Sequence, residues 1–481
     1  MGEIAISIIE NVNNLESKTA KLGSTKFPQF LAAFTVGFLC FAYGSATGWL
    51  SPTLPFLQSN NSAIGIPPIT EEEASWLSSL PFLGALVATP VFSFICQYFG
   101  RKAGGYVTVM PAIVSWIIII FSNSILQLYI ARFLVGLAFG GIIVFVPMYT
   151  GEMAEDSIRG ALGAFLPMIC NIGTVFTYAV APFMSIQIMS IISLIPPLIY
   201  VFAFYWLPES PTYFMSKGKT DEASNSMLWF RGKIKDSAER DLQKLKDLMD
   251  KKSNPNSSAE KNLKKLFFSR GTVRALTICF VVCAAQQLSG IYIVLNYCNE
   301  IMSNASSDVS PYIASVSVAA IQLLGSIVAS FTVEIYGRKI MLITSQIAMG
   351  VCLGSLGTYF YYQNQGEDLT NFSMLPVICV SVYLFANGVG PAPIGYVLIS
   401  ETFHPDIRGV ATTIASSNIW ALAFMITKLY PLMLGLLGMH GCYWTFATVC
   451  VLCTVYTVFQ IPETRNRTLE SILNELNGEK S

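Results

Sequence analysis

The sequence predicts an all-α membrane protein with twelve transmembrane helices in two halves of six, and three observations lead to this fold class. Of the 481 residues, 53% are hydrophobic and 12% are charged, whereas a soluble chain is about 25% charged. Apolar runs of about 20 residues, the length that crosses a bilayer as a helix, recur along the whole chain. Motifs of the first half return in the second half in the same order.

The apolar runs set the order of the predicted helices and the domain boundaries. Twelve runs stand out, at 28–50, 74–97, 104–123, 126–147, 160–182, 185–206, 272–297, 311–333, 340–361, 374–399, 409–436 and 440–461. The domains that follow are a tail (1–27), a six-helix half (28–206), a polar linker with short helices (207–271), a second six-helix half (272–461) and a second tail (462–481).

Basic residues and glycosylation sequons orient the chain in the membrane. Of the 29 Lys and Arg, fifteen lie between Lys217 and Arg274, in the linker and directly after it. Cytoplasmic loops are enriched in Lys and Arg, so we expect the linker and both tails to be cytoplasmic. The predicted outer loops carry sequons at Asn60, Asn304 and Asn371, which fit the same orientation as glycosylation sites.

Three short motifs occur twice. YFGRK (98–102) returns as IYGRK (335–339), GEMAEDSIRG (151–160) as SETFHPDIRG (400–409), and LPESPT (207–212) as IPETRN (461–466). The copies follow the second, fourth and sixth runs of each half, so all six lie on the predicted cytoplasmic side. Two halves in the same orientation imply a pseudo-two-fold axis along the membrane normal, with a ligand site between the halves.

The charged residues of these motifs are expected to form a cytoplasmic gate. Charged hydrogen bonds between the two halves would close the inner side and break when it opens. The alternative is that basic residues only anchor helix ends, which is the simpler explanation for Lys102 or Lys339 alone. The residues assigned to the gate are Arg101, Glu152, Arg159, Glu209, Glu334, Arg338, Glu401, Arg408 and Glu463.

Charged residues inside the apolar runs are rare. We expect Arg132, in the fourth run, to snorkel or to bond backbone carbonyls, and Lys428, in the eleventh, to snorkel. No Asp or Glu lies mid-membrane, which disfavours proton coupling because proton-driven carriers commonly use an intramembrane carboxylate. With only two His, and with most of the eleven Cys inside the runs, we predict no metal site and no enzymatic constellation.

Uncharged polar side chains are concentrated in the later runs. A single amide in a bundle often only joins helices, but a set of amides interleaved with aromatic rings suits a neutral, hydroxyl-rich ligand, because an amide both donates and accepts. The tenth run also contains NGVGPAPIG (387–395), where we expect a helix break and gate at Gly388, Gly390, Pro391 and Pro393. The polar set is Gln286, Gln287, Asn296, Gln322, Asn387, Tyr396, Asn418 and Trp420.

Several motifs together resemble the sugar porter family of the major facilitator superfamily. They include ARFLVGLAFGGIIVFVPMYTGE (131–152), QQLSGI (286–291), VGPAPIGYVLISE (389–401) and IPETRNRTLESI (461–472), and the match covers about 28–475. The resemblance implies the major facilitator fold, alternating access and a sugar substrate. Within the family, the chain looks most like the facilitated trehalose transporters of insects.

The resemblance also implies which residues bind the sugar. By position it assigns Gln286, Gln287, Gln322, Tyr396 and Trp420, and it matches Arg132 to an arginine of the family's fourth helix. The proton-coupling aspartate of symporting members corresponds to Ala46, which favours uniport. The chain departs from the family pattern at Gln97, Pro167, Tyr292, Gly388 and Ile419, and our predicted binding set includes both Tyr292 and Asn296.

We therefore predict a facilitative transporter that moves a hexose or trehalose across the plasma membrane. A proton-coupled sugar symporter and a non-transporting sugar sensor stay open as alternatives. The expected partners are a small neutral sugar and the lipid bilayer. We predict no cofactor, no nucleic acid and no obligate protein partner.

Overall fold

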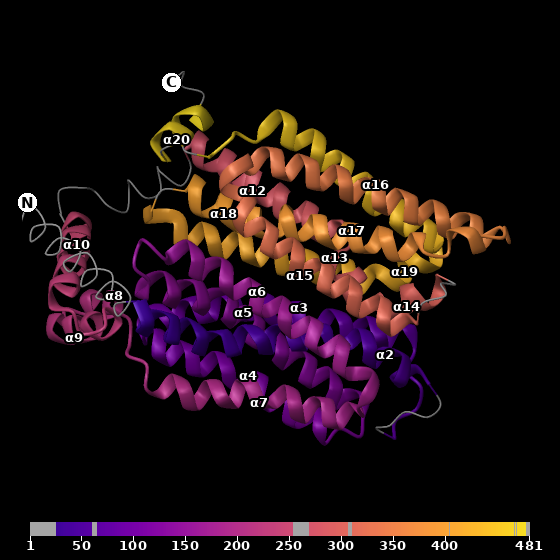
Figure 1. Ribbon diagram of the computed structural model, residues 1–481, viewed down its shortest axis with the longest axis horizontal. Coiled ribbons are helices and arrows are strands. Elements are labelled where there is room, and N and C mark those ends of the chain that lie inside the picture. The colour runs from indigo at the N-terminus through magenta and orange to yellow at the C-terminus, as the bar shows by residue number, and fades with distance from the viewer. Residues whose placement is uncertain are drawn as a thin grey trace, which may run out of the picture.

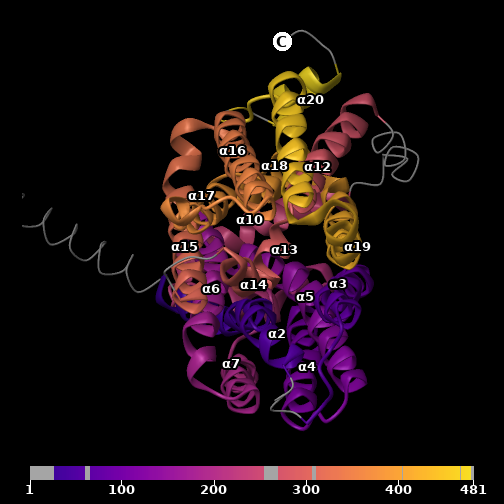
Figure 2. The same cartoon turned by 90° about the vertical axis from the view of Figure 1, so that its right-hand side faces the viewer.

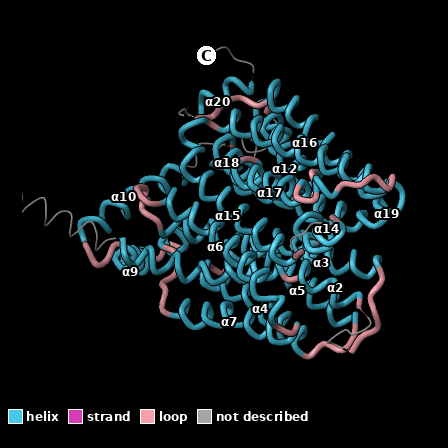
Figure 3. Tube along the Cα trace, turned by 45° about the vertical axis from the view of Figure 1, so that its right-hand side comes forward, coloured by secondary structure: helices cyan, strands magenta, loops and turns pink. Residues whose placement is uncertain are grey.

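The computed structural model describes residues 26–59, 65–253, 269–305, 310–403, 405–465, 467 and 469–477. Within these residues the regular elements are all helices, and Figure 3 shows no strand among them. Eleven of the described helical segments are long and apolar enough to cross a membrane. The prediction of an all-α membrane fold is confirmed.

The first half of the chain forms the lower layer of Figure 1, from indigo to magenta. The helix of residues 26–48 turns at Trp49 into α2, so the first span, Lys26–Gln58, is longer than the run 28–50. The elements that follow are α2 (Leu50–Gln58), α3 (Glu71–Tyr98), α4 (Arg101–Ile120), α5 (Ile125–Met153), α6 (Arg159–Val180), η1 (Ala181–Phe183) and α7 (Ile186–Tyr205).

The second half forms the upper layer, from orange to yellow. Its elements are α12 (Arg270–Leu288), α13 (Ile291–Asn296), α14 (Cys298–Asn304), α15 (Pro311–Tyr336), α16 (Arg338–Asn364), η2 (Thr370–Phe372), α17 (Leu375–Val389), α18 (Pro391–Thr402) and α19 (Pro405–Gln460). Figure 2 shows the same two layers after a quarter turn, with α13 and α14 between them.

Short helices mark one end of the bundle. The linker forms α8 (Pro211–Ser216), α9 (Thr220–Phe230) and α10 (Lys235–Ser253), and α20 (Leu469–Asn477) closes the described chain. All four lie toward the left in Figure 1, whereas α2 and α14 lie at the right. We call the left end the linker end and the right end the far end.

Glycines interrupt two of the apolar runs and separate two others. Gly290 has φ +83°, which favours glycine, and it separates α12 from α13. Gly390, with φ −110° and ψ −91°, separates α17 from α18. Gly438, with φ +66°, interrupts α19 between the two predicted runs 409–436 and 440–461. The break at Gly290 was not predicted, because its run is apolar on both sides.

The two halves share part of their apolar core, and this shared part lies toward the far end. One cluster of buried side chains combines the C-terminal half with far-end residues of the first half, such as Leu54 and Phe82. The linker-end core of the first half, which includes Phe145 and Tyr149, forms a separate cluster. The two halves therefore share a core toward the far end and have separate cores toward the linker end.

Candidate functional site

The paired glutamines lie at the end of α12, directly before the break at Gly290. A Cβ on Gly290 would meet the Phe446 ring at 2.7 Å, so only glycine fits both this conformation and this packing. Gln287 is 2% exposed, and its Oε1 atom is buried without a hydrogen-bond partner, whereas Gln286 is half-buried. A buried amide oxygen without a partner costs free energy unless a ligand or water satisfies it.

Two aromatic side chains of the C-terminal half face one ring of the N-terminal half. The Tyr292 ring, on α13, lies 4.3 Å from the Phe82 ring on α3. Trp420, on α19, stacks on Phe82 at 6.2 Å between ring centroids. Trp420 is 1% exposed, and its Nε1 has no hydrogen-bond partner. The two halves thus meet at an aromatic cluster that contains an unused indole donor.

The other predicted binding residues are distributed around this cluster. Asn296, on α13, is buried, and its Nδ2 has no partner. Gln322, on α15, is half-buried and lies one turn before Ser326, which accepts a 2.7 Å hydrogen bond from Asn171 of the N-terminal half. Tyr396 is part of α18, and its side chain lies outside the described part of the structure.

Asn387 belongs with these residues, although our binding set did not include it. It is 2% exposed, and its Oδ1 has no partner. Tyr383, one turn earlier on α17, donates a 3.0 Å hydrogen bond to the Ser289 carbonyl next to the paired glutamines. Residues four apart share a helix face, so Asn387 lies on the face of α17 that meets the end of α12. The sequence signal that could have added Asn387 to the binding set was its place among the polar residues of the later runs.

The break in the tenth run lies against α16. A Cβ on Gly390 would meet the Ser345 side chain at 2.4 Å, so a larger residue would push the two helices apart. A Cβ on Gly388 would lie 3.0 Å from the Gln322 carbonyl. Pro391 and Pro393 begin α18, where a missing N–H is tolerated. Whether this break acts as a gate stays a prediction.

At the linker end of the N-terminal half, Arg101 is the centre of a charged cluster. Its guanidinium donates to both carboxylate oxygens of Glu152, with a distance of 2.8 Å from Nε to Oε2. The backbone N–H groups of Arg101 and Lys102 donate to Glu209 at 2.9 Å. The Ser210 hydroxyl completes the cluster by donating to Glu152. Burial raises the pKa of Glu209, although these N–H groups act in the opposite direction.

The C-terminal half repeats this cluster. Arg338 donates to Glu401 at 2.7 Å, and the backbone N–H groups of Arg338 and Lys339 donate to Glu463 at 3.0 and 3.1 Å. Thr464 donates to Glu401 as Ser210 does to Glu152. Burial acts to raise the pKa of Glu463, but four backbone N–H groups outweigh burial and lower this pKa.

Both clusters require glycine before the arginine. Gly100 has φ +102° and Gly337 has φ +85°, and a Cβ on either would lie 2.4 to 2.6 Å from the glutamate that the next N–H groups bind. The GRK sequence therefore forms a turn whose amides hold a carboxylate. Ser210 and Thr464 were absent from the predicted gate, although both directly follow the repeated Pro-Glu pair.

The bonds of the gate residues described above run within each half, whereas we expected bonds between the halves. Arg159 forms an exposed ion pair with Asp156 at 2.9 Å. The side chains of Glu334 and Arg408 lie outside the described structure. The clusters can thus stay intact while the halves move, and their part in gating stays a prediction.

Apart from the Asn171–Ser326 bond, the polar contacts between the halves described here lie toward the far end. The Asn299 backbone N–H donates to Ser51 Oγ at 3.1 Å, and the Tyr178 hydroxyl donates to the Leu295 carbonyl at 2.5 Å. Lys428 was expected to snorkel, but its Nζ donates a 2.9 Å hydrogen bond to Ser75 of the opposite half. Together with the shared core, these contacts show that the halves are closed on each other at the far end.

The buried arginine of α5 bonds backbone carbonyls. Arg132 is 3% exposed and donates to the carbonyls of Leu77 at 2.9 Å and Ala46 at 3.1 Å. Its guanidinium also lies 5.6 Å from the Trp49 ring centroid. Arg132 therefore links α5 to α3 and to the helix of residues 26–48 by hydrogen bonds.

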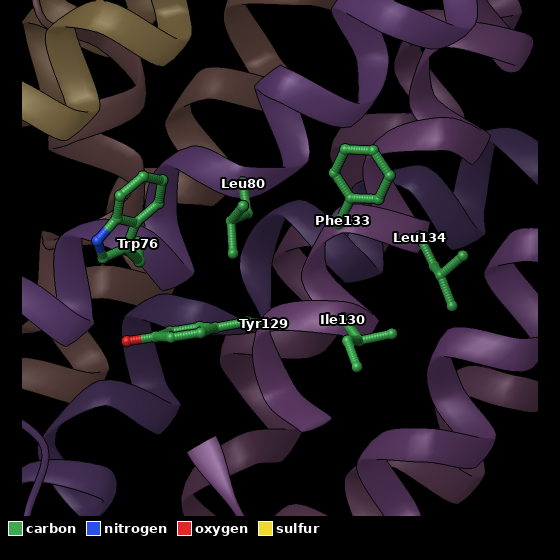
Figure 4. Close-up of a pocket in the computed structure, with 6 residues that line it drawn as sticks. All are labelled: Trp76, Leu80, Tyr129, Ile130, Phe133 and Leu134. Atoms are coloured by element: carbon green, nitrogen blue, oxygen red, sulfur yellow. The ribbon is translucent and has the colours of Figure 1, made fainter. Parts of the chain in front are cut away.

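A separate groove of about 430 Å³ lies between α3 and α5. Figure 4 shows Trp76 and Tyr129 at one end of it and aliphatic and Phe side chains along the rest. Its lining lacks amides, which distinguishes it from the polar cluster around Gln287. The lining residues are Trp76, Leu80, Tyr129, Ile130, Phe133 and Leu134.

Two of the predicted glycosylation sites are described. Asn304 ends α14 and Asn371 is part of η2, and both are exposed at the far end. Asn60 lies outside the described residues. All eleven cysteines are free thiols, nine of them buried, as expected for small apolar side chains within a bundle.

Comparison with known families gives one match over most of the chain. Residues 32–476 match the family described as "Sugar (and other) transporter". The facilitated trehalose transporter Tret1 of Polypedilum vanderplanki is 30% identical over 454 residues, covering 94% of this chain and 88% of that protein. Tret1 of Drosophila mojavensis is 28% identical, and this chain spans about half of its length (51%). These relatives are transporters rather than enzymes.

Solved structures show the same fold. The proton:xylose symporter XylE bound to 6-bromo-6-deoxy-D-glucose, a major facilitator superfamily protein, superposes with a TM-score of 0.74. It is 22% identical and covers 92% of this chain and 98% of its own. The inward-open conformation of XylE from E. coli also gives 0.74, at 21% identity and 92% and 99% coverage.

Proposed function

Since the chain belongs to the sugar transporter family, we propose that it carries a neutral sugar, trehalose or a hexose, as a uniporter across the plasma membrane. Twelve crossings with cytoplasmic termini complete the proposed topology, with the interruption at Gly438 dividing α19 into two crossings. The names of the similar insect proteins support trehalose as the first sugar to test.

The observation that carries this proposal is a set of unsatisfied polar atoms in the C-terminal half. Gln287 Oε1, Asn296 Nδ2, Asn387 Oδ1 and Trp420 Nε1 are all buried without partners. They comprise two acceptors and two donors, which is the pattern that sugar hydroxyls satisfy. The aromatic rings beside them offer flat faces for the C–H surface of a sugar. A bound sugar would therefore lie between α12, α13, α17 and α19.

Alternating access provides the mechanism. The linker end, rich in Lys and Arg, is assigned to the cytoplasm. The far end is closed by the Asn299, Tyr178 and Lys428 contacts, and the linker-end cores of the two halves are separate. We assign this arrangement to the state that faces the cytoplasm. Transport then requires the halves to rock, so that far-end contacts break while each charged cluster keeps its own half rigid.

Uniport is supported by the sequence of the spans, which have no carboxylate at mid-depth. Ala46 occupies the position that the family resemblance assigns to a proton-coupling acid, and its carbonyl accepts a bond from Arg132. A carrier without a mid-membrane carboxylate has no evident group to take a proton across with each sugar.

Uptake of labelled trehalose and glucose by transport-deficient cells that express the chain tests this function. We expect uptake that saturates and that survives a protonophore. Uptake abolished by the protonophore would show symport instead. Surface expression with neither flux would contradict both sugars, and signalling without flux would identify a sensor.

A further inference from the structure

Glu300, on α14, is a half-buried acid that the proposed transport cycle does not use. It lies in the first turn of this short far-end helix, outside the membrane-spanning segments. Its Oε2 atom is buried and has no hydrogen-bond partner. Ionising the carboxyl is costly, because its buried Oε2 atom has neither water nor a donor to compensate the charge.

Asn299, the residue before Glu300, links the two halves at the far end by hydrogen bonds. The Asn299 backbone N–H donates to Ser51 Oγ at 3.1 Å, and the Asn299 Oδ1 atom accepts from the Ser315 hydroxyl at 2.6 Å. Ser51 belongs to α2 of the N-terminal half and Ser315 to α15 of the C-terminal half. Closing the far end therefore also fixes the backbone that carries Glu300 against the opposite half.

Among the described residues, the charged group that acts on Glu300 is another acid. Glu71, the first residue of α3 in the opposite half, acts on Glu300 with its own negative charge and is itself bonded to Gln58 at 2.9 Å. Tyr297, Tyr430 and Tyr443 are titratable groups that also interact electrostatically with Glu300. Neither α2 nor α13 has a charged residue, and the single charge of α15, Glu334, lies at its linker end.

Burial, with the charge of Glu71 as a second cause, raises the pKa of Glu300 to about 7. Opening the far end would separate α14 from α2 and α3 and admit water. The carboxyl would then return toward the ordinary glutamate pKa of about 4.3. The closed state thus binds a proton more tightly than the open state.

We propose that Glu300 is an external proton-binding site, and that its protonation favours closure of the far end. This inference rests on the alternating access proposed above but not on the identity of the sugar. The proton binds and leaves on the same side of the membrane, so the site regulates the carrier without coupling proton flux to sugar flux.

The direction of the pH effect follows from the two protonation states. Above the closed-state pKa, ionised Glu300 faces Glu71 and opposes closure. Below it, the neutral acid removes this repulsion. Because the window lies between the open-state and closed-state pKa values, lowering external pH from 8 to 6 is expected to raise the closed-to-open ratio about tenfold.

Distances between spin labels on the full-length chain in nanodiscs test this. Phe121 and Leu436, at the far ends of opposite halves, are 75% and 76% exposed, so we expect labelled cysteines there to leave the packing intact. The half-buried Cys170 and Cys352 are replaced by serine in this background. We expect the long-distance, open population to fall about tenfold relative to the closed one between pH 8 and pH 6, without any sugar present.

Three variants decide the assignment. Glu300→Gln should keep the closed distance at both pH values. Glu71→Gln leaves Glu300 in place, removes its negative neighbour and should shift the midpoint to lower pH. Asp368→Asn changes an exposed far-end acid and should leave the pH response as it is. A pH-independent wild type, or a response that persists in Glu300→Gln, would overturn the proposal. Because no sugar is used, failure here leaves the proposed cargo standing, and absent sugar flux leaves this test valid.

Discussion

The N-terminal half holds Arg101, Glu152 and Glu209 in a cluster that the C-terminal half reproduces with Arg338, Glu401 and Glu463, down to the paired backbone N–H donors. At mid-depth the halves differ. In the first half, Ser45 bonds Ser193 and Thr177 at 2.9 Å each, so its hydroxyls satisfy one another. In the second half, buried amide and indole atoms have no partners.

This difference separates scaffold from site. The duplicated clusters stabilise helix ends in both halves. In a rocking motion each half moves as a rigid body, so each half needs a cluster of its own. Unsatisfied buried polar atoms destabilise a fold unless a ligand compensates them. Such atoms occur in both halves, but the amides among them, those of Gln287, Asn296 and Asn387, all belong to the second half, which supports the ligand site proposed there. The N-terminal half contributes mainly apolar and aromatic surface, such as Phe82.

The largest expected effect comes from removing an amide of the C-terminal half. Gln287→Ala deletes a buried acceptor beside the Gly290 break, and we expect sugar kcat/KM to fall about a hundredfold, which corresponds to about 2.7 kcal/mol. The measurement is initial uptake rate against sugar concentration, normalised to surface expression. The matched control is Gln97→Ala in the N-terminal half, where the amide is exposed. Equal losses in both variants would contradict a site in the second half.

The second prediction tests the similarity of the halves. Arg101→Ala and Arg338→Ala each leave a mostly buried glutamate without its cation, since the side chains of Glu152 and Glu401 are 17% and 25% exposed. We expect each to lower the free energy of unfolding by about 2–3 kcal/mol, less than a fully buried pair because both clusters reach solvent. Thermal unfolding of purified protein measures this.

Charge balance provides the control for the arginine variants. Adding Glu401→Gln to Arg338→Ala removes the unpaired charge and should recover part of the lost stability. Arg159→Ala breaks an exposed pair and should cost under about 0.5 kcal/mol. A large loss in only one half would show that the two clusters are not equivalent.

The third prediction concerns the indole donor. Trp420→Phe keeps a ring against Phe82 and removes Nε1, so the apparent sugar affinity should weaken about fivefold, or about 1 kcal/mol. Trp49→Phe removes an equally buried and unpartnered Nε1 from the N-terminal half, beside Arg132. It should leave the affinity unchanged. Competition of labelled uptake by unlabelled sugar measures both, and a similar weakening in Trp49→Phe would contradict the assignment.

Hydrophobicity and repetition predict the helices, and the Gly- and Pro-rich motif predicts the break at Gly390. They do not predict the break at Gly290, the cluster members Ser210 and Thr464, or which residues pair. The run around Gly290 is apolar throughout, so its break depends on packing against Phe446, which is distant in sequence. Likewise, GRK and Pro-Glu are visible as repeats, yet only the fold shows that their amides and carboxylates meet within one half. Glu300 gave no sequence signal, because its environment comes from Glu71 in the other half.

The smallest expected effect distinguishes the two carboxylates that occupy equivalent places. Burial raises the pKa of Glu209, so its charge opposes folding, and its contribution to stability declines as pH rises through its folded-state pKa. The pKa of Glu463 is lowered because four N–H groups outweigh burial, so its contribution is present above the unfolded-state pKa and is lost as pH falls through the folded-state pKa. At pH 7, Glu463→Gln should therefore cost about 1 kcal/mol and Glu209→Gln less. Toward pH 4 the deficit of Glu463→Gln should shrink and that of Glu209→Gln should grow, and unfolding midpoints measured across this range that move in parallel would show that the two halves hold their carboxylates alike.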